Sequence, residues 1–116
     1  MDVEELDVFK LSHNLVLTIY KLTDKFPQRE LFSLTLQMRR AASSVPMNIV
    51  EGANRKTKAE YRHFLGIAKG SASEVKYQLL LASDLGYIER GEAEKLRSEF
   101  SRVLQMLTKL IKALQN

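Results

Sequence analysis

The sequence predicts an all-α protein, folded as an antiparallel, up-down-up-down four-helix bundle. Apolar residues recur at steps of three and four along most of the chain, which is the helical period. Only five glycines and two prolines interrupt the 116 residues, and no long stretch alternates with the period of two that marks a strand. A chain of this length fits a single domain, residues 1–116.

The first predicted helix covers residues 3–25 and carries apolar side chains on two faces. One row is Leu6, Phe9, His13, Val16, Ile19 and Tyr20, and the other is Val8, Leu11, Leu15 and Leu22. The segment FPQRE should end this helix, because the residue before a proline avoids helical backbone angles. Pro27 then suits the first turn of the next helix.

The second predicted helix covers residues 28–53 and contains Pro46. This proline lacks an amide donor and crowds the carbonyl of Ala42, so we expect a kink, with a break at Val45 as the alternative. Gly52 and Asn54 are suitable terminators. The apolar stripe is Leu31, Leu34, Met38, Ala41, Val45 and Ile49, beside a row of Phe32, Leu36 and Val50.

The third predicted helix, residues 57–85, opens with the segment TKAE. Thr57 and Glu60 have the spacing of a capping box, and Gly86 suits a C-terminal cap. The fourth predicted helix, residues 90–114, has a heptad seam, which favours packing at shallow angles. The seam is Ala93, Leu96, Phe100, Val103, Leu107, Leu110 and Leu114.

Short connections make successive helices antiparallel neighbours, which gives the up-down-up-down bundle. The doubled apolar rows of the first two helices exceed what one core face needs. A broad apolar surface on a small monomer promotes association, so the pattern favours an oligomer. The alternative is that some of these side chains are scattered surface residues, which are common in soluble proteins.

Small residues occupy both sides of the expected contact between the second and third helices. Folding the chain about a turn near Arg55 places residues 41–44 (AASS) opposite residues 66–71 (GIAKGS). Gly66 and Gly70 are four residues apart and so share a face. We interpret them as positions where the two backbones approach closely, in preference to a ligand cleft.

The same folding brings Arg40 within a turn of Glu74, and we expect an ion pair there that links the two helices. Arg39 lies on the row of Phe32 and Leu36, which makes it either an interface residue or a solvent-facing phosphate contact. Glu51 should lie near Glu60, Arg55 or a neighbouring chain. The structural positions are therefore Arg40, Pro46, Glu51, Gly66, Gly70 and Glu74.

Composition indicates a soluble, cytoplasmic protein. The chain is 45% hydrophobic and 28% charged, which is ordinary for a globular domain with one core. No apolar run approaches the length of a membrane span, and the acidic N-terminus lacks the apolar segment of a signal peptide. Without cysteine there is no disulfide, thiolate nucleophile or cysteine metal site.

An enzyme is disfavoured, and we expect no cofactor and no metal. Glu60 and His63 have the Glu-x-x-His spacing of di-iron bundles, but such a site needs two of these motifs, and Lys10 stands where His13 would require a glutamate. The segment GIAKGSASE is no phosphate-binding loop, because its glycines lie inside a predicted helix and no strand precedes it.

The formal net charge of +4 permits contact with nucleic acid. Cations gather at the turn between the second and third helices and along the third, and such a cluster can contact phosphates. The alternative is a solvated charged face that keeps the protein soluble. The candidate nucleic-acid-binding residues are Arg39, Arg55, Lys56, Lys58, Arg62 and Lys69.

Two segments, FPQRELFSLTLQMRRAASSVPMNIVEGANR and YRHFLGIAKGSASEVKYQLLLASDLGYI, resemble the four-helix bundle family of 23S rRNA intervening-sequence proteins. The similarity runs from about Leu6 to Leu114 and is most specific in FP..E, QMRRAASSVPMNIVEG and GSASE. One departure is His13–Asn14, where a small residue is expected in the core-facing row. This departure affects the expected packing of the first helix and leaves the expected fold unchanged.

The resemblance implies a small bacterial bundle that forms a homopentameric ring around a channel, with no enzymatic activity. It also implies likeness to the accessory protein of diversity-generating retroelements, which binds a reverse transcriptase and nucleic acid through basic surface. Two functions follow as expectations. One is an RNA-associated accessory protein that can also contact DNA, and the other is a scaffold that docks a partner such as a reverse transcriptase without binding nucleic acid.

Overall fold

The computed structural model describes residues 2–115 and consists of helices. The elements in chain order are η1 (Val3–Glu5), α1 (Asp7–Thr23), η2 (Gln28–Glu30), α2 (Leu34–Ala53), α3 (Lys58–Asp84) and α4 (Arg90–Ala113). Two of these, η1 and η2, are single 3-10 turns. No strand occurs in residues 2–115, so the all-α fold class with four long helices is confirmed.

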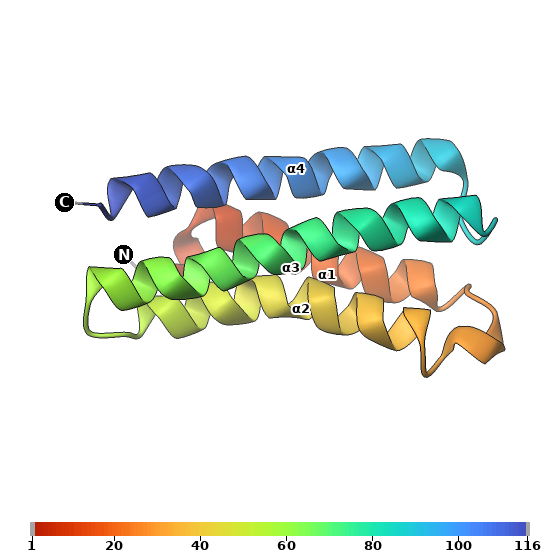
Figure 1. Cartoon of the computed structure of the whole chain (residues 1–116), viewed down its shortest axis with the longest axis horizontal. Coiled ribbons are helices and arrows are strands. Elements are labelled where there is room, and N and C mark those ends of the chain that lie inside the picture. Colours follow the sequence, from red (N-terminus) through yellow and green to blue (C-terminus); the bar gives the residue numbers. More distant parts are fainter. Residues whose placement is uncertain (1, 116) are drawn as a thin grey trace.

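The four long helices lie side by side in a bundle that measures 46 × 25 × 20 Å (Figure 1). Helix α1 packs against α2 and α4, and α3 packs against the same two helices. Following the colours in Figure 1, the connections between successive long helices alternate between the two ends of the bundle. The turn between α2 and α3 therefore lies at the same end as the C-terminal end of α4.

The core is formed by one face of each long helix. The predicted seam of α4 is buried from Ala93 to Leu107, and Leu110 and Leu114 pack half-buried against it. On α1 the core row is Val8, Leu15, Ile19 and Leu22, joined by Ser12. His13 and Asn14 are exposed, so the expectation that this pair lies in the core-facing row is wrong.

Helix α1 is shorter than predicted at both ends. The Asp2 carboxylate accepts a hydrogen bond from the Glu4 amide and starts η1, and Leu6 then takes extended backbone angles before α1 begins at Asp7. At its other end α1 stops at Thr23, whose hydroxyl donates to the carbonyl of Ile19. An apolar period cannot reveal this early stop, because Phe26 remains buried after the helix has ended.

Helix α2 begins at Leu34 and not at residue 28, because the Glu30 carboxylate organises a separate turn. This carboxylate accepts hydrogen bonds from the Ser33 hydroxyl at 2.5 Å, from the Tyr87 hydroxyl at 2.7 Å and from the Leu34 amide at 3.4 Å. Ser33 has non-helical angles (φ −125°, ψ −101°) and interrupts the helix. Tyr87 follows α3, so Glu30 ties the α1–α2 connection to the α3–α4 connection.

Helix α3 has a cap at each end, close to the predicted positions. The Thr57 hydroxyl accepts a hydrogen bond from the Glu60 amide at 3.1 Å and donates one to the Glu60 carboxylate at 3.1 Å. A full capping box would instead have the Glu60 carboxylate accept from the Thr57 amide. Gly86 has φ +82°, which glycine adopts without strain. Its amide bonds to the Ser83 carbonyl, and the Tyr87 amide bonds to the Ala82 carbonyl, which together form a Schellman motif.

Pro46 is buried within α2, and the helix continues without a break to Ala53 (Figure 1). The predicted alternative of a break at Val45 is therefore wrong. The Ser43 hydroxyl donates to the Arg39 carbonyl at 2.8 Å, one turn before the carbonyl that loses its donor at the proline. The Asn48 side chain donates to the Ser44 carbonyl at 2.8 Å and stabilises the following turn.

The contact between α2 and α3 is close, but Gly66 and Gly70 do not form it. Both are exposed, and a Cβ atom at either position would meet nothing within 4 Å. The buried small residues of α3 are instead Ala68 and Ala72. The Ser44 and Ser71 hydroxyls are 2.8 Å apart. The predicted folding placed Ser71 beside Arg40, so the observed alignment of α3 with α2 differs by four residues, about one turn. Extended backbone at Thr57 carries α3 outward beyond the end of α2 (Figure 1).

Gly52 is the glycine that permits the close approach. A Cβ atom there would lie 2.9 Å from Cδ1 of Tyr61, 3.0 Å from Cβ of Phe64 and 3.1 Å from the Tyr61 carbonyl oxygen. Two of these atoms belong to or adjoin the α3 backbone and cannot move aside independently. The pairing of α2 with α3 therefore depends on a missing side chain at residue 52.

Replacing Gly52 with alanine should lower the free energy of unfolding by about 1–3 kcal/mol, because the added methyl group overpacks the contact. Gly70→Ala is the matched control and should raise it by up to about 1 kcal/mol, because alanine favours helix and meets open space. Urea unfolding measures both. Equal effects of the two substitutions would contradict the assigned contact.

The Glu30 cluster should make stability depend on pH. Hydrogen bonds from Ser33, the larger cause, and from Tyr87 hold the pKa of the Glu30 carboxyl below its usual range. Its stabilising contribution is fully present above the unfolded-state pKa and is lost as pH falls through the lower folded-state pKa. Wild type should therefore lose more stability than Glu30→Gln between about pH 5 and pH 3.

Urea midpoints measured across that pH range test the role of Glu30. Glu92→Gln, which removes an exposed carboxylate from the first turn of α4, serves as the control and should follow wild type. Parallel curves for wild type and Glu30→Gln would show that the carboxylate is not held by these hydrogen bonds.

Candidate nucleic-acid interface

The predicted cations do not form one patch. Arg55 and Lys56 lie in the α2–α3 turn, and Lys58 begins α3. Arg62 and Lys69 follow along α3, half-buried. Arg39 lies on α2 beside the C-terminal end of α1, which is the other end of the bundle. The structure therefore brings together the turn and the start of α3 and separates Arg39 from them.

Arg55 is exposed, and its side chain contacts two residues of the same chain. Its guanidinium forms an ion pair with Glu51, one helical turn earlier, and lies 4.8 Å from the ring centroid of Phe64. Of the three surroundings predicted for Glu51, Arg55 is therefore the one found. An exposed pair of this kind contributes little to stability, so the guanidinium can exchange the carboxylate for another anion at small cost.

Arg62 joins α3 to the end of α4. Its Nη1 donates to the carbonyl oxygen of Leu114 at 2.6 Å, where the last carbonyls of α4 lack helical partners. A cation at a helix C-terminus is also favoured by the helix dipole. This contact spans 52 residues of sequence and has no local sequence signature.

Lys56 and Lys58 are exposed, and Lys69 is half-buried. None of the three forms an ion pair among residues 2–115. Lys69 shares an open groove with Lys109 of α4, which was not among the predicted cations. The cations of α4 lie outside its apolar seam, and the prediction from that seam therefore did not include them.

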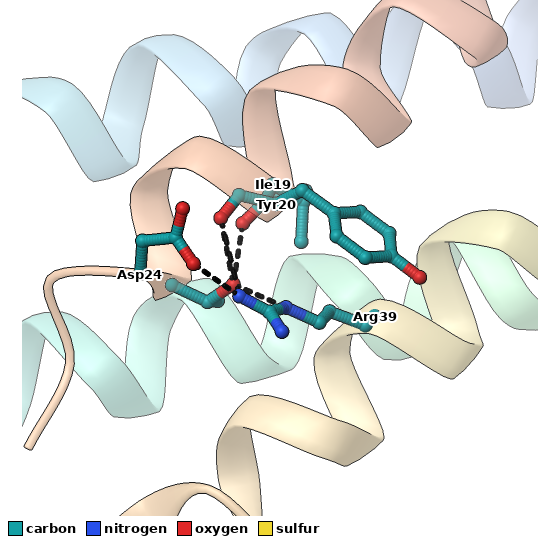
Figure 2. A network of polar contacts seen from close by, with 5 residues as sticks. Ile19, Tyr20, Asp24 and Arg39 are labelled. Atoms are coloured by element: carbon teal, nitrogen blue, oxygen red, sulfur yellow. Dashed lines mark hydrogen bonds and ion pairs between the residues drawn. The ribbon is translucent and has the colours of Figure 1, made fainter. Parts of the chain in front are cut away.

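Arg39 links α1 to α2 (Figure 2). Its Nε donates to the Thr23 hydroxyl at 2.9 Å, and its Nη2 donates to the Asp24 carboxylate at 2.8 Å and to the Tyr20 carbonyl at 3.4 Å. The guanidinium carbon lies 4.8 Å from the Tyr20 ring centroid. With 21% of its side chain exposed, Arg39 is mainly a structural residue, which neither predicted role anticipated.

The predicted Arg40–Glu74 ion pair is not formed. Within residues 2–115 the ion pairs are Arg39–Asp24 and Arg55–Glu51. Arg40 and Glu74 are both exposed, where an ion pair gains little over hydration. Glu74 instead accepts a long hydrogen bond of 3.5 Å from Gln78 on its own helix.

An open apolar groove of about 470 Å³ lies between α1 and α2. Its walls are mainly Phe9, Val16, Pro46, Met47 and Val50, and His13 and Ser43 complete the lining. Phe9, His13 and Val16 belong to the first apolar row predicted for residues 3–25, and Val50 belongs to the second row predicted for residues 28–53. The groove offers shape and apolar surface but few polar groups that could orient a small ligand.

Metal-ligating side chains are not clustered in residues 2–115: no three His, Cys, Asp or Glu residues are placed to hold one ion. The Glu60 carboxylate contacts Thr57 at the helix cap, and the His63 ring lies edge-on to Phe64 at 5.3 Å. Within the same residues, no helix is long and apolar enough to cross a membrane.

These features define a class: a small all-α helical bundle with an apolar groove on one side and cations at one end. The sequence matches the family described as 23S rRNA-intervening sequence protein over residues 4–109. The chain therefore belongs to this family.

A similar solved structure is the crystal structure of a protein of unknown function from the S23 ribosomal protein family of Bacteroides thetaiotaomicron VPI-5482. The TM-score is 0.84 at 25% sequence identity, and the match covers 90% of this chain and 98% of that one. No curated protein matches the sequence. The similarity supports the fold and family and assigns no activity.

Replacing Arg39 with alanine should lower the free energy of unfolding by about 1–2 kcal/mol, because hydrogen bonds to a half-buried guanidinium are lost. Arg40→Ala removes the same charge from the next residue and should change it by less than about 0.5 kcal/mol. Urea unfolding of the two variants compares them directly. A larger effect at Arg40 would contradict the assigned roles.

Proposed function

We propose that this protein is a non-enzymatic, cytoplasmic accessory protein that self-associates and binds RNA through phosphate contacts. In this proposal the antiparallel bundles assemble into a homopentameric ring, so that each basic surface occurs five times. Repetition matters because several weak phosphate contacts on one assembly give useful affinity together. Base-specific reading is not expected, since no helix stands out for insertion into a groove.

The observation that carries the proposal is the lack of internal neutralisation of the cations near the α2–α3 turn. Lys56 and Lys58 are exposed, and Lys69 is half-buried, and none of them has a carboxylate partner in the described residues. Arg62 keeps donors beyond the one used on Leu114. Arg39 contributes least, because its guanidinium already binds three groups of α1.

Self-association is supported by the apolar surface of α1 and α2. Met47 is 66% exposed at the edge of the α1–α2 groove, and Leu17 and Tyr20 are about half exposed on α1. A contiguous apolar surface on a chain of this size favours burial against another copy. The name of the family, which refers to 23S rRNA, is consistent with an RNA partner.

A second candidate function is a scaffold that docks a protein partner, such as a reverse transcriptase, without binding nucleic acid directly. Phe32 favours it, because this large side chain is 86% exposed in the turn before α2. An aromatic side chain held in the open is typical of an interaction anchor. Binding of RNA by the purified protein alone distinguishes the first function from this one.

Purified protein should bind a labelled 12-nucleotide oligouridylate, and its affinity should fall steeply as salt rises from about 50 to 200 mM, because bound counterions are released. Fluorescence anisotropy measures this. The double variant Lys56→Glu, Lys58→Glu should bind more weakly. Affinity that does not change with salt, or absence of binding, would contradict the proposed RNA function.

Light scattering on the same samples tests the assembly. A mass close to five times 13.3 kDa is expected, whereas the mass of one chain at micromolar concentration would contradict self-association. If a monomer binds RNA with the same affinity, RNA binding through phosphate contacts is supported, and the proposed contribution of repeated basic surfaces is contradicted.

A further inference from the structure

A groove follows the outer side of the contact between α3 and α4. One stretch, of about 530 Å³, is lined by Lys69, Ser73, Leu104, Gln105, Thr108 and Lys109. A second stretch, of about 340 Å³, is lined by Lys76, Glu94, Arg97, Ser98 and Ser101. We call both stretches together the α3–α4 groove. Four cations line it, Lys69, Lys76, Arg97 and Lys109, whereas no lysine or arginine lines the groove between α1 and α2. Apolar atoms still make up most of the exposed surface of the first stretch.

Cations on one face of α3 form a row that leads from Arg62, outside the lining, into this groove. Arg62, Lys69 and Lys76 follow one another at intervals of seven residues, which places them on one face of α3. Each interval corresponds to about 10 Å along the helix axis. Arg97 and Lys109 face this row from α4. The row therefore presents positive charge continuously over about 20 Å.

This positive charge is not neutralised within the chain. No cation of the row forms an ion pair among residues 2–115. Glu94 is the one acidic residue that lines either stretch, and it lies at the end marked by Arg97. From residue 100 to residue 115, α4 and its end carry Arg102, Lys109 and Lys112 and no acidic residue.

Four acidic residues near this end of the bundle lie outside the lining of the α3–α4 groove. Asp2, Glu4, Glu5 and Asp7 precede or begin α1, and the turn that contains them packs against α1 and α2. At this end of the bundle, these four carboxylates are therefore separated from the cations that α4 carries between residues 100 and 115. Such separation creates a field that attracts a polyanion to the α3–α4 side.

Arg62, at the end of the row, and Arg97, which faces the row from α4, are held in place by hydrogen bonds to the backbone. Arg62 donates to the Leu114 carbonyl, and the Nε of Arg97 donates to the Lys76 carbonyl at 3.0 Å. Each guanidinium keeps further N–H donors for a ligand. Fixing the side chain beforehand lowers the entropy lost on binding. Gly66 shares the row with Arg62 and Lys69, and its open surroundings leave the groove accessible between them.

From these observations we propose that the α3–α4 groove binds the phosphodiester backbone of single-stranded RNA without regard to sequence. Lysine, arginine, serine, threonine and glutamine are the side chains that commonly contact phosphate oxygens, and they make up most of the lining. The lining contains no aromatic residue on which bases could stack, so contacts to the backbone alone are expected.

The shape of the groove selects a single strand. Neighbouring helix axes in a bundle lie about 8–10 Å apart, which admits one strand between the ridges and excludes a duplex. This inference rests on the proposed RNA function and moves its main contact surface from the α2–α3 turn to the α3–α4 groove. Lys69 belongs to both surfaces, and Arg62 lies between them, whereas Lys76, Arg97 and Lys109 are new.

The test is a triple variant in which Lys69, Lys76 and Lys109 are replaced by glutamine, K69Q/K76Q/K109Q. The matched control, K10Q/K21Q/K25Q, removes the same charge from exposed positions of α1 and the segment that follows it. Binding of a labelled 12-nucleotide oligouridylate is measured by anisotropy at several salt concentrations. Circular dichroism and light scattering confirm that both variants keep the helical content and mass of wild type.

The groove variant should bind at least tenfold more weakly at about 100 mM salt, and the slope of log affinity against log salt should decrease by about 2, as expected for three lost phosphate contacts. The control should lose less than about threefold, since only its distant charge is removed. The single variants K69Q, K76Q and K109Q each repeat the comparison and should each decrease the slope by about 0.7.

Other outcomes separate the two proposals. Wild type that does not bind RNA would overturn the proposed function and this inference together. Equal losses in the groove variant and the control would overturn the groove and leave RNA binding intact. A 12-bp RNA duplex bound as tightly as the single strand would overturn the selection by shape. A 12-residue polyglutamate bound as tightly would overturn RNA as the occupant and indicate an acidic protein partner.

Discussion

The close contact between α2 and α3 determines where the other parts of the molecule lie. At one point it depends on the absence of a side chain at Gly52, against which Tyr61 and Phe64 pack directly. About two turns further along, small residues continue the contact, and the Ser44 and Ser71 hydroxyls meet at 2.8 Å. Helices that approach this closely fix one register, because any slip would bring larger side chains into the contact.

That register sets the position of the charged surface. Because α3 extends beyond the end of α2, Arg62 reaches the Leu114 carbonyl at the end of α4. Helix α3 also packs against α4. The apolar core holds the helices together, while the register decides which polar residues line the grooves between them. Gly52 therefore affects the proposed function indirectly, because the close contact that it permits sets the positions of the polar residues along α3 and α4.

Periodic patterns predicted the four helices and the α4 seam, because a helix buries every third or fourth residue whatever its neighbour is. They did not predict which residues meet across helices. Gly66 and Gly70 were placed in the α2–α3 contact and are exposed, because the buried face of α3 runs through Leu65, Ala68, Ala72 and Val75 instead. Arg39 and Arg40 are adjacent in sequence, and only the path of α1 decides that Arg39 finds Thr23 and Asp24.

Arg62 and Arg97 donate to backbone carbonyls, but the lysines of the α3–α4 groove form no ion pair within residues 2–115 that would stabilise the free bundle. Like charges along one face repel one another, and half-buried lysines at residues 69 and 76 lose side-chain freedom without gaining a carboxylate partner. Alternating charges on this face would make the folded chain more stable than a row of like charges does. Binding of an anion reverses this balance, since a ligand that binds only the folded chain stabilises it by mass action. The groove is thus better explained by an anionic ligand than by the requirements of the fold.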